Sequence, residues 1–279
     1  MKIRPLPILM LVLFVVFAIV SVSRGRRSEK PADEAAATAA PAPVETPAPE
    51  EPAEAGTAET ETDTAAGTPE SGTTVDAAWF DDAAFVGDSV SLKLSYYAAA
   101  TGCLGNAQFF ASGSLGSANA MWELSDPQAV HPSYQGEKML VEDCVAASGA
   151  KKLFIMLGMN DIAVYGVDGA VENYRTLLGR ILAKSPGLTV YVQSMTPTTS
   201  GSNLIGEKIN SDSIRQYNAQ LQQLCQQQGW RYVDVASVMY DESGQYLCAD
   251  YCSDPDDMGV HFTEAGCQAW VDYLYSHCA

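Results

Sequence analysis

The apolar run KLFIML at residues 152–157 constrains the fold of this chain more than any other stretch. Leu153 to Leu157 are consecutive apolar residues, and Gly149 and Gly158 close to the two ends limit the run to the length of a strand. A strand of this composition places apolar side chains on both of its faces, so both faces must be covered. The run therefore predicts a central strand of a parallel sheet with helices packed on either side.

The segments around this run alternate between strand-like and helix-like hydrophobic patterns. The predicted strands are residues 84–86, 107–111, 152–157, 188–193 and 231–235. The predicted helices are residues 90–100, 139–147, 171–183, 209–228 and 263–276, with Thr263 as the cap of the last helix. Such alternation is typical of an α/β fold with a mainly parallel, five-stranded sheet.

The N-terminal residues 1–27 contain an apolar run from Leu6 to Val22, with basic residues before and after it. The run is long for the core of a signal peptide and slightly short for a membrane span. The arginines directly behind it favour an uncleaved signal-anchor over a cleaved signal peptide. Both interpretations export the rest of the chain, to the outside of the cell membrane or into the medium, and the predicted membrane contact is this segment alone.

Residues 28–75 consist mainly of Ala, Pro, Glu, Thr and Gly, without any aromatic residue, Leu, Ile or Met. A segment of this kind cannot bury enough apolar surface to offset the entropy lost on ordering, so it is predicted to be a disordered linker. Residues 76–279 then have the length of one domain. This domain holds ten Lys or Arg against 23 Asp or Glu, a balance that argues against binding to nucleic acid.

All seven cysteines lie in the predicted domain, and they lack the paired C-x-x-C spacing of a zinc site. Most of them are expected to be small core residues. Export would permit disulfides, and Cys248 and Cys252 are the first pair to consider. The sequence implies neither a metal nor a cofactor.

The stretch FVGDSVS, residues 85–91, raises a question about Ser89, which lies between the first predicted strand and the first predicted helix. Serine is a preferred N-cap, and an N-cap needs no further function. The loops behind the other predicted strands, however, carry Gly113, the pair Asn160-Asp161 and His261. Ligands of open α/β sheets bind at this edge, beyond the carboxyl ends of the strands.

The order Gly-Asp-Ser, then a glycine, then Gly-x-Asn-Asp, then a histidine near the C-terminus resembles the SGNH hydrolases, also called the GDSL esterase/lipase family. The resemblance covers residues 80–279 and is to a bacterial, membrane-tethered member. It implies a flavodoxin-like three-layer α/β/α fold. It further implies that Ser89 is the nucleophile and His261 its base. The implied oxyanion hole combines the backbone N–H groups of Ser89 and Gly113 with the side-chain amide of Asn160.

The chain departs from the family pattern at one catalytic position. The family places an Asp three residues before the His, where this chain has Met258. Asp257 is predicted to orient His261 through a shifted loop. Asp254, acting across an insertion, and a Ser-His dyad without any Asp are the alternatives. Gly116, three residues beyond Gly113, is the alternative oxyanion glycine.

These features predict an extracytoplasmic serine esterase that hydrolyses a small acyl ester, acetyl before others, through a Ser-His acyl-enzyme. An acylated glycan of the cell envelope is the substrate suggested by the predicted location. A lysophospholipase or thioesterase and an acyltransferase would use the same site. An inactive glycan- or protein-binding module is the alternative of a different class.

Overall fold

The computed structural model describes residues 74–279. The predicted signal-anchor at residues 1–27 and nearly all of the predicted linker at residues 28–75 lie outside the described residues. Among the helices of residues 74–279, none combines the length and the apolar character needed to cross a membrane.

A five-stranded parallel sheet forms the centre of the described domain. Its strand order is β2-β1-β5-β6-β7, in which the sheet's own strands run 2-1-3-4-5 as in flavodoxin-like folds. The strands are β1 (Ala83–Gly87), β2 (Gln108–Ala111), β5 (Lys152–Met156), β6 (Thr189–Gln193) and β7 (Arg231–Val233). The predicted five-stranded parallel sheet is confirmed, and the apolar run 152–157 supplies its central strand.

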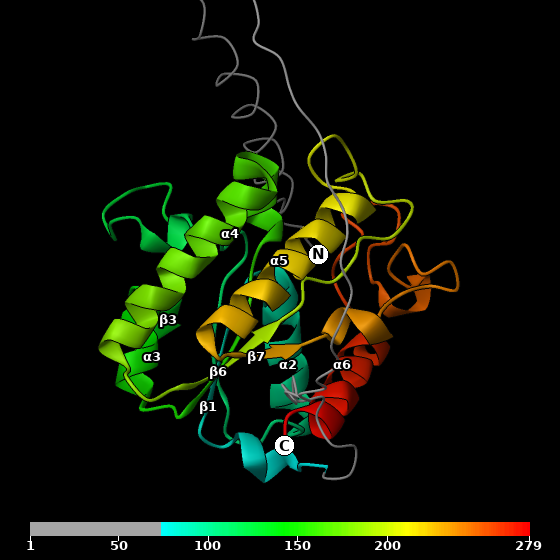
Figure 1. Ribbon diagram of the computed structural model, residues 1–279. Coiled ribbons are helices and arrows are strands. Elements are labelled where there is room, and N and C mark those ends of the chain that lie inside the picture. The colour runs from blue at the N-terminus through cyan, green and yellow to red at the C-terminus, as the bar shows by residue number, and fades with distance from the viewer. Residues whose placement is uncertain (1–73) are drawn as a thin grey trace, which may run out of the picture. The chain divides into compact units, whose positions relative to one another are not determined.

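Helices cover both faces of this sheet, so the domain has the three layers that the sequence predicted (Figure 1). One face packs against α3 (Val141–Ser148), α4 (Met159–Lys184) and α5 (Ser211–Gln228). The other packs against α2 (Ser89–Thr101) and α6 (Glu264–His277). Successive residues of β5 alternate between the two cores: Leu153 and Ile155 face the first set of helices, and Phe154 faces the second.

A ladder of aromatic rings crosses the sheet on the α2/α6 face. The ring of Phe154 in β5 stacks on Phe85 of β1 and on Tyr191 of β6, with ring centroids 4.6 Å and 4.5 Å apart. These residues are direct partners in the register of the parallel pairs. Cross-strand aromatic pairs stabilise one register over its alternatives, so this ladder favours the alignment in which the three strands end level.

The first residues of α4 differ from the prediction. The helix was expected to begin at residue 171, but it begins at Met159 and contains one non-helical residue, Gly166, with φ of 70°. The glycines at 166 and 169 interrupt the apolar period that marks a helix, which is why the sequence pattern missed the first turns. As a result, Asn160 and Asp161 lie in the first turn of a helix rather than in a loop.

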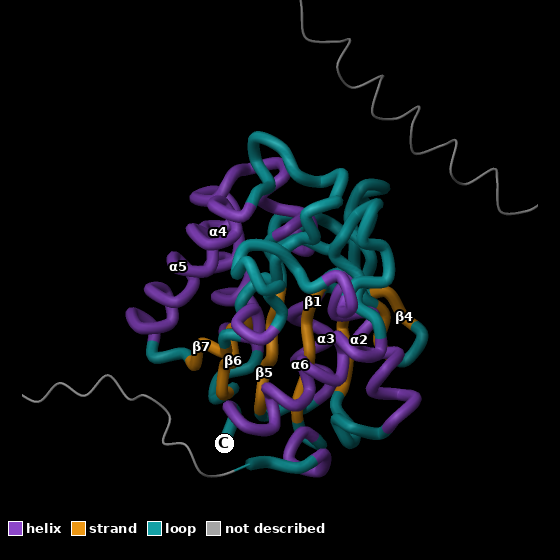
Figure 2. The backbone as a smooth tube through the Cα atoms, turned by 90° about the vertical axis from the view of Figure 1, so that its right-hand side faces the viewer, coloured by secondary structure: helices purple, strands orange, loops and turns teal. Residues whose placement is uncertain are grey.

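Short elements absent from the prediction fill the connections. They are the hairpin β3 (Ser133–Tyr134) and β4 (Glu137–Lys138), and the 3-10 helices η1 (Ala77–Phe80), η2 (Asn119–Met121), η3 (Val235–Val238) and η4 (Ala249–Tyr251). Figure 2 shows loops gathered at one edge of the sheet. Gly87, Ala111 and Met156 are register partners at the carboxyl ends of β1, β2 and β5, so the loops behind these strands start side by side.

Candidate active site

The turn between β1 and α2 presents Ser89 at the first position of the helix. Asp88, not Ser89, is the N-cap: its carboxylate accepts a hydrogen bond of 2.9 Å from the backbone N–H of Val90. Gly87 has no room for a side chain, because a Cβ there would lie 2.0 Å from Oγ of Ser91. The cap is therefore supplied by a neighbour, and the hydroxyl of Ser89 is free for another contact.

That contact is His261. Nε2 of His261 lies 3.0 Å from Oγ of Ser89, and Nδ1 of the same ring lies 2.7 Å from Oδ2 of Asp254. His261 comes from the loop that precedes α6, 172 residues along the chain from Ser89. The side chains of His261 and Asp254 are each about one-fifth exposed, so the ring is enclosed but open to a ligand. Serine, histidine and carboxylate thus form one continuous chain of hydrogen bonds.

Asp254 is held by the segment that surrounds it. Its Oδ1 accepts hydrogen bonds from the backbone N–H of Val260 at 3.3 Å and of His261 at 3.2 Å, and from the thiol of Cys252 at 3.1 Å. Burial alone would raise the pKa of Asp254, but the hydrogen bonds from His261 and Cys252 bring its pKa below the usual value. Asp254 is therefore an anion at neutral pH and faces the imidazole as one.

The prediction that Asp257 orients His261 is wrong. Asp257 is exposed, and its carboxylate accepts a 2.6 Å hydrogen bond from the side-chain amide of Asn203. The chain turns tightly after Asp254, because the backbone N–H groups of Asp257 and Gly259 both donate to the carbonyl of Asp254. This turn brings His261 back to Asp254 and leaves Asp257 exposed to solvent. The alternative in which Asp254 orients His261 across an insertion therefore describes the site.

The opposite side of Ser89 is formed by the loops behind β2 and β5. The side-chain amide of Asn160 donates to the carbonyl of Leu115 at 3.0 Å, which uses one of its two N–H groups and leaves the other for a ligand. Asp161 is buried and accepts hydrogen bonds from the backbone N–H of Ser117 at 2.7 Å and of Ala118 at 2.9 Å. Asp161 thus fixes the loop behind β2 against the start of α4.

The two candidate glycines of this loop differ in what they can donate. The backbone N–H of Gly116 is taken by Oδ1 of Asn119 at 2.8 Å, and Gly116 is buried against Asp161 and Asn160. Gly113 is exposed, and a Cβ there would meet nothing within 4 Å. Ser112 donates its backbone N–H to the carbonyl of Gly87, so Gly113 follows directly beside the turn that carries Ser89. The geometry favours Gly113 as the donor that faces a ligand.

The cysteines form no disulfide among residues 74–279, and the predicted core role holds for most of them. Cys248 and Cys252, the pair considered first, are both thiols. Cys252 instead contacts Asp254, a role that the sequence did not indicate. Only the fold shows that this thiol contacts the carboxylate that binds His261.

This arrangement fits nucleophilic chemistry on a carbonyl group. A serine hydroxyl needs an adjacent base to become a nucleophile, and His261 lies at hydrogen-bond distance from it. Carboxylate–imidazole contact fixes which ring nitrogen carries the proton and stabilises the protonated ring. The N-terminal ends of α2 and α4 point their free N–H groups to the same edge, where a developing negative charge would be favoured.

The sequence comparison agrees with this geometry. Residues 85–269 match the GDSL-like lipase/acylhydrolase family. Among curated proteins, the search finds no match.

Solved structures show the same fold. One is a Streptococcus pneumonia protein provisionally described as a platelet activating factor. It is 18% identical to this chain with a TM-score of 0.51, and the match covers 69% of this chain and 81% of that chain. Another is a provisionally described acylhydrolase from Bacteroides fragilis. It is 18% identical with a TM-score of 0.52, and the match covers 69% of this chain and 83% of that chain. At this identity the likeness concerns the fold alone.

The buried cap Asp88 predicts a specific pH dependence of stability. Burial, partly opposed by the Val90 hydrogen bond, raises the pKa of Asp88 from 3.8 to about 6. Between about pH 4 and 6 the carboxyl of Asp88 therefore stays protonated in the folded chain but is ionised in the unfolded chain. The resulting contribution to the free energy of unfolding is complete at low pH and is lost as the pH rises through about 6. Asp88→Asn keeps the acceptor but not the charge. We expect wild type to lose up to about 3 kcal/mol against Asp88→Asn between about pH 4 and 7.

Chemical denaturation of both proteins across this pH range measures the difference. Asp88→Ala is the control: it lacks the cap and should lose about 1 kcal/mol relative to Asp88→Asn at every pH. Parallel pH curves for wild type and Asp88→Asn would show that the carboxyl is not perturbed by its burial.

The two glycines behind β2 give a matched test of the loop geometry. Gly116→Ala would bring a Cβ within 2.8 Å of Oδ2 of Asp161, so we expect it to lower the free energy of unfolding by about 1–3 kcal/mol. Gly113→Ala meets open space and should leave this quantity within about 0.5 kcal/mol. Urea unfolding compares the two variants, and equal stability would contradict the described packing.

Proposed function

This chain belongs to the GDSL-like lipase/acylhydrolase family and is an ester-hydrolysing enzyme, and we propose that it cleaves small acyl esters, acetyl esters first, through a Ser-His-Asp acyl-enzyme. One observation carries the proposal. The hydrogen-bonded chain from Oγ of Ser89 through His261 to Asp254 joins a nucleophile, a base and an orienting carboxylate.

In the first half of the proposed reaction, Oγ of Ser89 attacks the carbonyl carbon of the ester while Nε2 of His261 takes the hydroxyl proton. The carbonyl π pair moves to its oxygen, which becomes an oxyanion. When that pair returns, the bond to the alcohol oxygen breaks, and His261 gives its proton to the leaving alcohol. The acyl group is left on Ser89 as an ester.

In the second half, water takes the place of the alcohol. His261 removes a proton from the water, whose oxygen attacks the acyl carbon, and returns this proton to Oγ of Ser89 as the acyl-enzyme breaks. The carboxylic acid leaves and the free enzyme is restored. Asp254 stays ionised throughout and stabilises the imidazolium that forms in each half.

The oxyanion is proposed to accept hydrogen bonds from the backbone N–H of Ser89, the backbone N–H of Gly113 and the side-chain amide of Asn160. Three features support this set. Asn160 has one N–H without a hydrogen bond to any of residues 74–279, Gly113 is exposed, and Asp161 fixes the loop behind β2. A single donor of this kind typically contributes about 100- to 1000-fold to the rate.

We place the enzyme outside the cytoplasm, with an acylated envelope glycan as its substrate. The support is in the sequence: an apolar run with basic flanks at residues 1–27, followed by 48 residues of linker composition at 28–75. Such a linker would let the domain reach polymers away from the membrane surface.

The alternative of an inactive binding module loses its main argument. Such a module would be favoured by Met258, which stands where the family has its catalytic acid. Because Asp254 occupies the place beside His261, the site has all three groups, and a binding module needs no such chain of contacts.

Hydrolysis of p-nitrophenyl acetate by the purified full chain tests the proposal. We expect turnover by wild type and a loss of at least about 10⁴-fold in kcat for Ser89→Ala, since without the hydroxyl no acyl-enzyme forms. The rates on butyryl and longer esters show which acyl length the enzyme prefers. Product analysis with an added acceptor sugar shows whether the acyl group is also transferred. Equal rates for wild type and Ser89→Ala on every ester would contradict the proposal.

The two aspartates of the turn provide a second test. Asp254→Asn should lower kcat by about 10³- to 10⁴-fold, because an amide no longer holds His261 in the required tautomer. Asp257→Asn changes a carboxylate whose hydrogen-bond partner in the described domain is Asn203, and we expect its kcat within about twofold of wild type. A greater loss for Asp257→Asn than for Asp254→Asn would reverse the assignment.

A further inference from the structure

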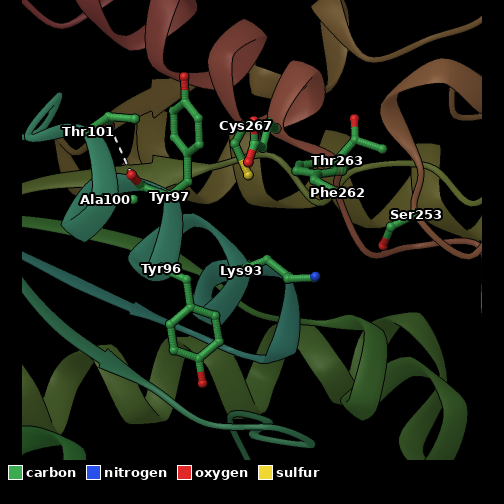
Figure 3. A pocket seen from close by; sticks show the side chains of 10 residues that line it. Lys93, Tyr96, Tyr97, Ala100, Thr101, Ser253, Phe262, Thr263 and Cys267 are labelled. Carbon is green, nitrogen blue, oxygen red and sulfur yellow. Dashed lines mark hydrogen bonds between the residues drawn. The ribbon is translucent and has the colours of Figure 1, made fainter.

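A pocket of about 320 Å³ lies between α2 and α6, next to the catalytic loop. Lys93, Tyr96 and Tyr97 line it from α2, and Phe262, Thr263 and Glu264 line it from the chain behind His261 (Figure 3). Its volume is at the lower end of the range for small-molecule sites, about 300–1,000 Å³, and fits one sugar ring. The reaction described above does not use these side chains.

The pocket reaches the catalytic groups at one end. Ser253, also in its lining, donates its hydroxyl to the carbonyl of His261 at 3.1 Å, and Phe262 follows His261 in the chain. Figure 3 shows the side chain of Lys93 extending along α2 towards the end where Ser253 lies. A group bound in the pocket would therefore lie beside the loop that carries His261.

Helix geometry brings Lys93 close to the nucleophile. Ser89 and Lys93 are separated by four residues of one helix, so their side chains lie on the same face with Cβ atoms about 6 Å apart. Side chains of a helix lean towards its N-terminus, and the ammonium group of Lys93 accordingly leans towards the turn that carries Ser89.

Lys93 differs from most other cations of the domain. Within residues 74–279, five Lys or Arg side chains pair with carboxylates, namely Lys152, Arg175, Arg180, Lys184 and Arg215. Lys93 is exposed and has neither an ion pair nor a hydrogen bond to any described residue, although acidic residues outnumber basic ones in the domain by more than two to one. An unpaired cation one helical turn from the nucleophile is available for a ligand.

We propose that this pocket binds the leaving alcohol of the substrate, and that this alcohol is a sugar bearing a carboxylate, which Lys93 recognises. The inference rests on the proposed esterase function and specifies its substrate as an ester of an acidic glycan. The ring of Tyr97 offers a flat apolar surface to the C–H face of the sugar, and Tyr97 is fixed by a hydrogen bond to Gln268.

Among anionic ligands, the charges around the pocket favour a monoanion over a dianion. The pocket has one cation, Lys93, and one carboxylate, Glu264, so a singly charged carboxylate is matched by Lys93. A doubly charged phosphate would have Lys93 as its single cationic partner, and its second negative charge would be repelled by Glu264 and by the other acidic residues of the domain. The hydroxyl oxygens of Ser253 and Thr263, which donate to the backbone carbonyls of His261 and Asp250, can each accept a hydrogen bond from a sugar hydroxyl.

A pair of substrates that differ in one group tests the proposal: acetylated methyl glucoside and the acetylated methyl glucuronide, in which a carboxylate replaces the primary alcohol. The readout is the ratio of kcat/KM for the acid ester over the neutral ester. We expect wild type to prefer the acid ester and Lys93→Gln to lower this ratio about tenfold. Lys93→Arg should retain most of the preference, and salt should weaken it.

Lys151→Gln is the matched control. Lys151 is also exposed, but it precedes β5 at the opposite edge of the sheet, and its loss should leave the ratio unchanged. Equal kcat/KM for the two esters in wild type, or the same ratio in wild type and Lys93→Gln, would overturn the proposed subsite while p-nitrophenyl acetate is still hydrolysed. Failure to hydrolyse any ester would instead refute the proposed function.

Discussion

The carboxylate of Asp254 is the group on which the rest of the site depends. It binds Nδ1 of His261 through one oxygen, and through the other it accepts from the thiol of Cys252 and from two backbone N–H groups. These contacts close the segment from Cys252 to His261 into a compact turn. An anion held in this way orients the imidazole and also fixes the loop that carries it, so one partly buried carboxylate serves both purposes.

The other half of the site follows from the sheet. β1, β2 and β5 end level with one another, and the stacked rings of Phe85 and Phe154 favour that register. Behind β1 and β5 a helix begins directly, and in each case an aspartate accepts backbone N–H groups: Asp88 within its own helix, Asp161 from the neighbouring loop. The turn that carries Ser89 and the loop behind β2 are therefore held by hydrogen bonds between buried aspartate side chains and backbone N–H groups.

Local patterns were sufficient for the sheet but not for all of the site. Alternating hydrophobic patterns predicted all five strands, and the resemblance to the SGNH hydrolases implied that Ser89 and His261 meet. The start of α4 was missed because Gly166 and Gly169 interrupt its apolar period. Asp254 was left as an alternative because it lies seven positions before His261. Whether the chain turns back over that distance depends on backbone hydrogen bonds, which the spacing of residues does not specify. For the same reason, the contact between Cys252 and Asp254 had no signal in the sequence.

The proposed chemistry requires Ser89 to be a nucleophile activated by His261 and Asp254. The most direct measurement is intact mass and peptide mapping of the full chain after treatment with phenylmethylsulfonyl fluoride, which sulfonylates activated serines. We predict one adduct per chain, located on Ser89, that forms far more slowly in His261→Ala. Absence of an adduct in wild type, an adduct on another serine, or equally fast labelling of His261→Ala would show that Ser89 is not a nucleophile activated by His261.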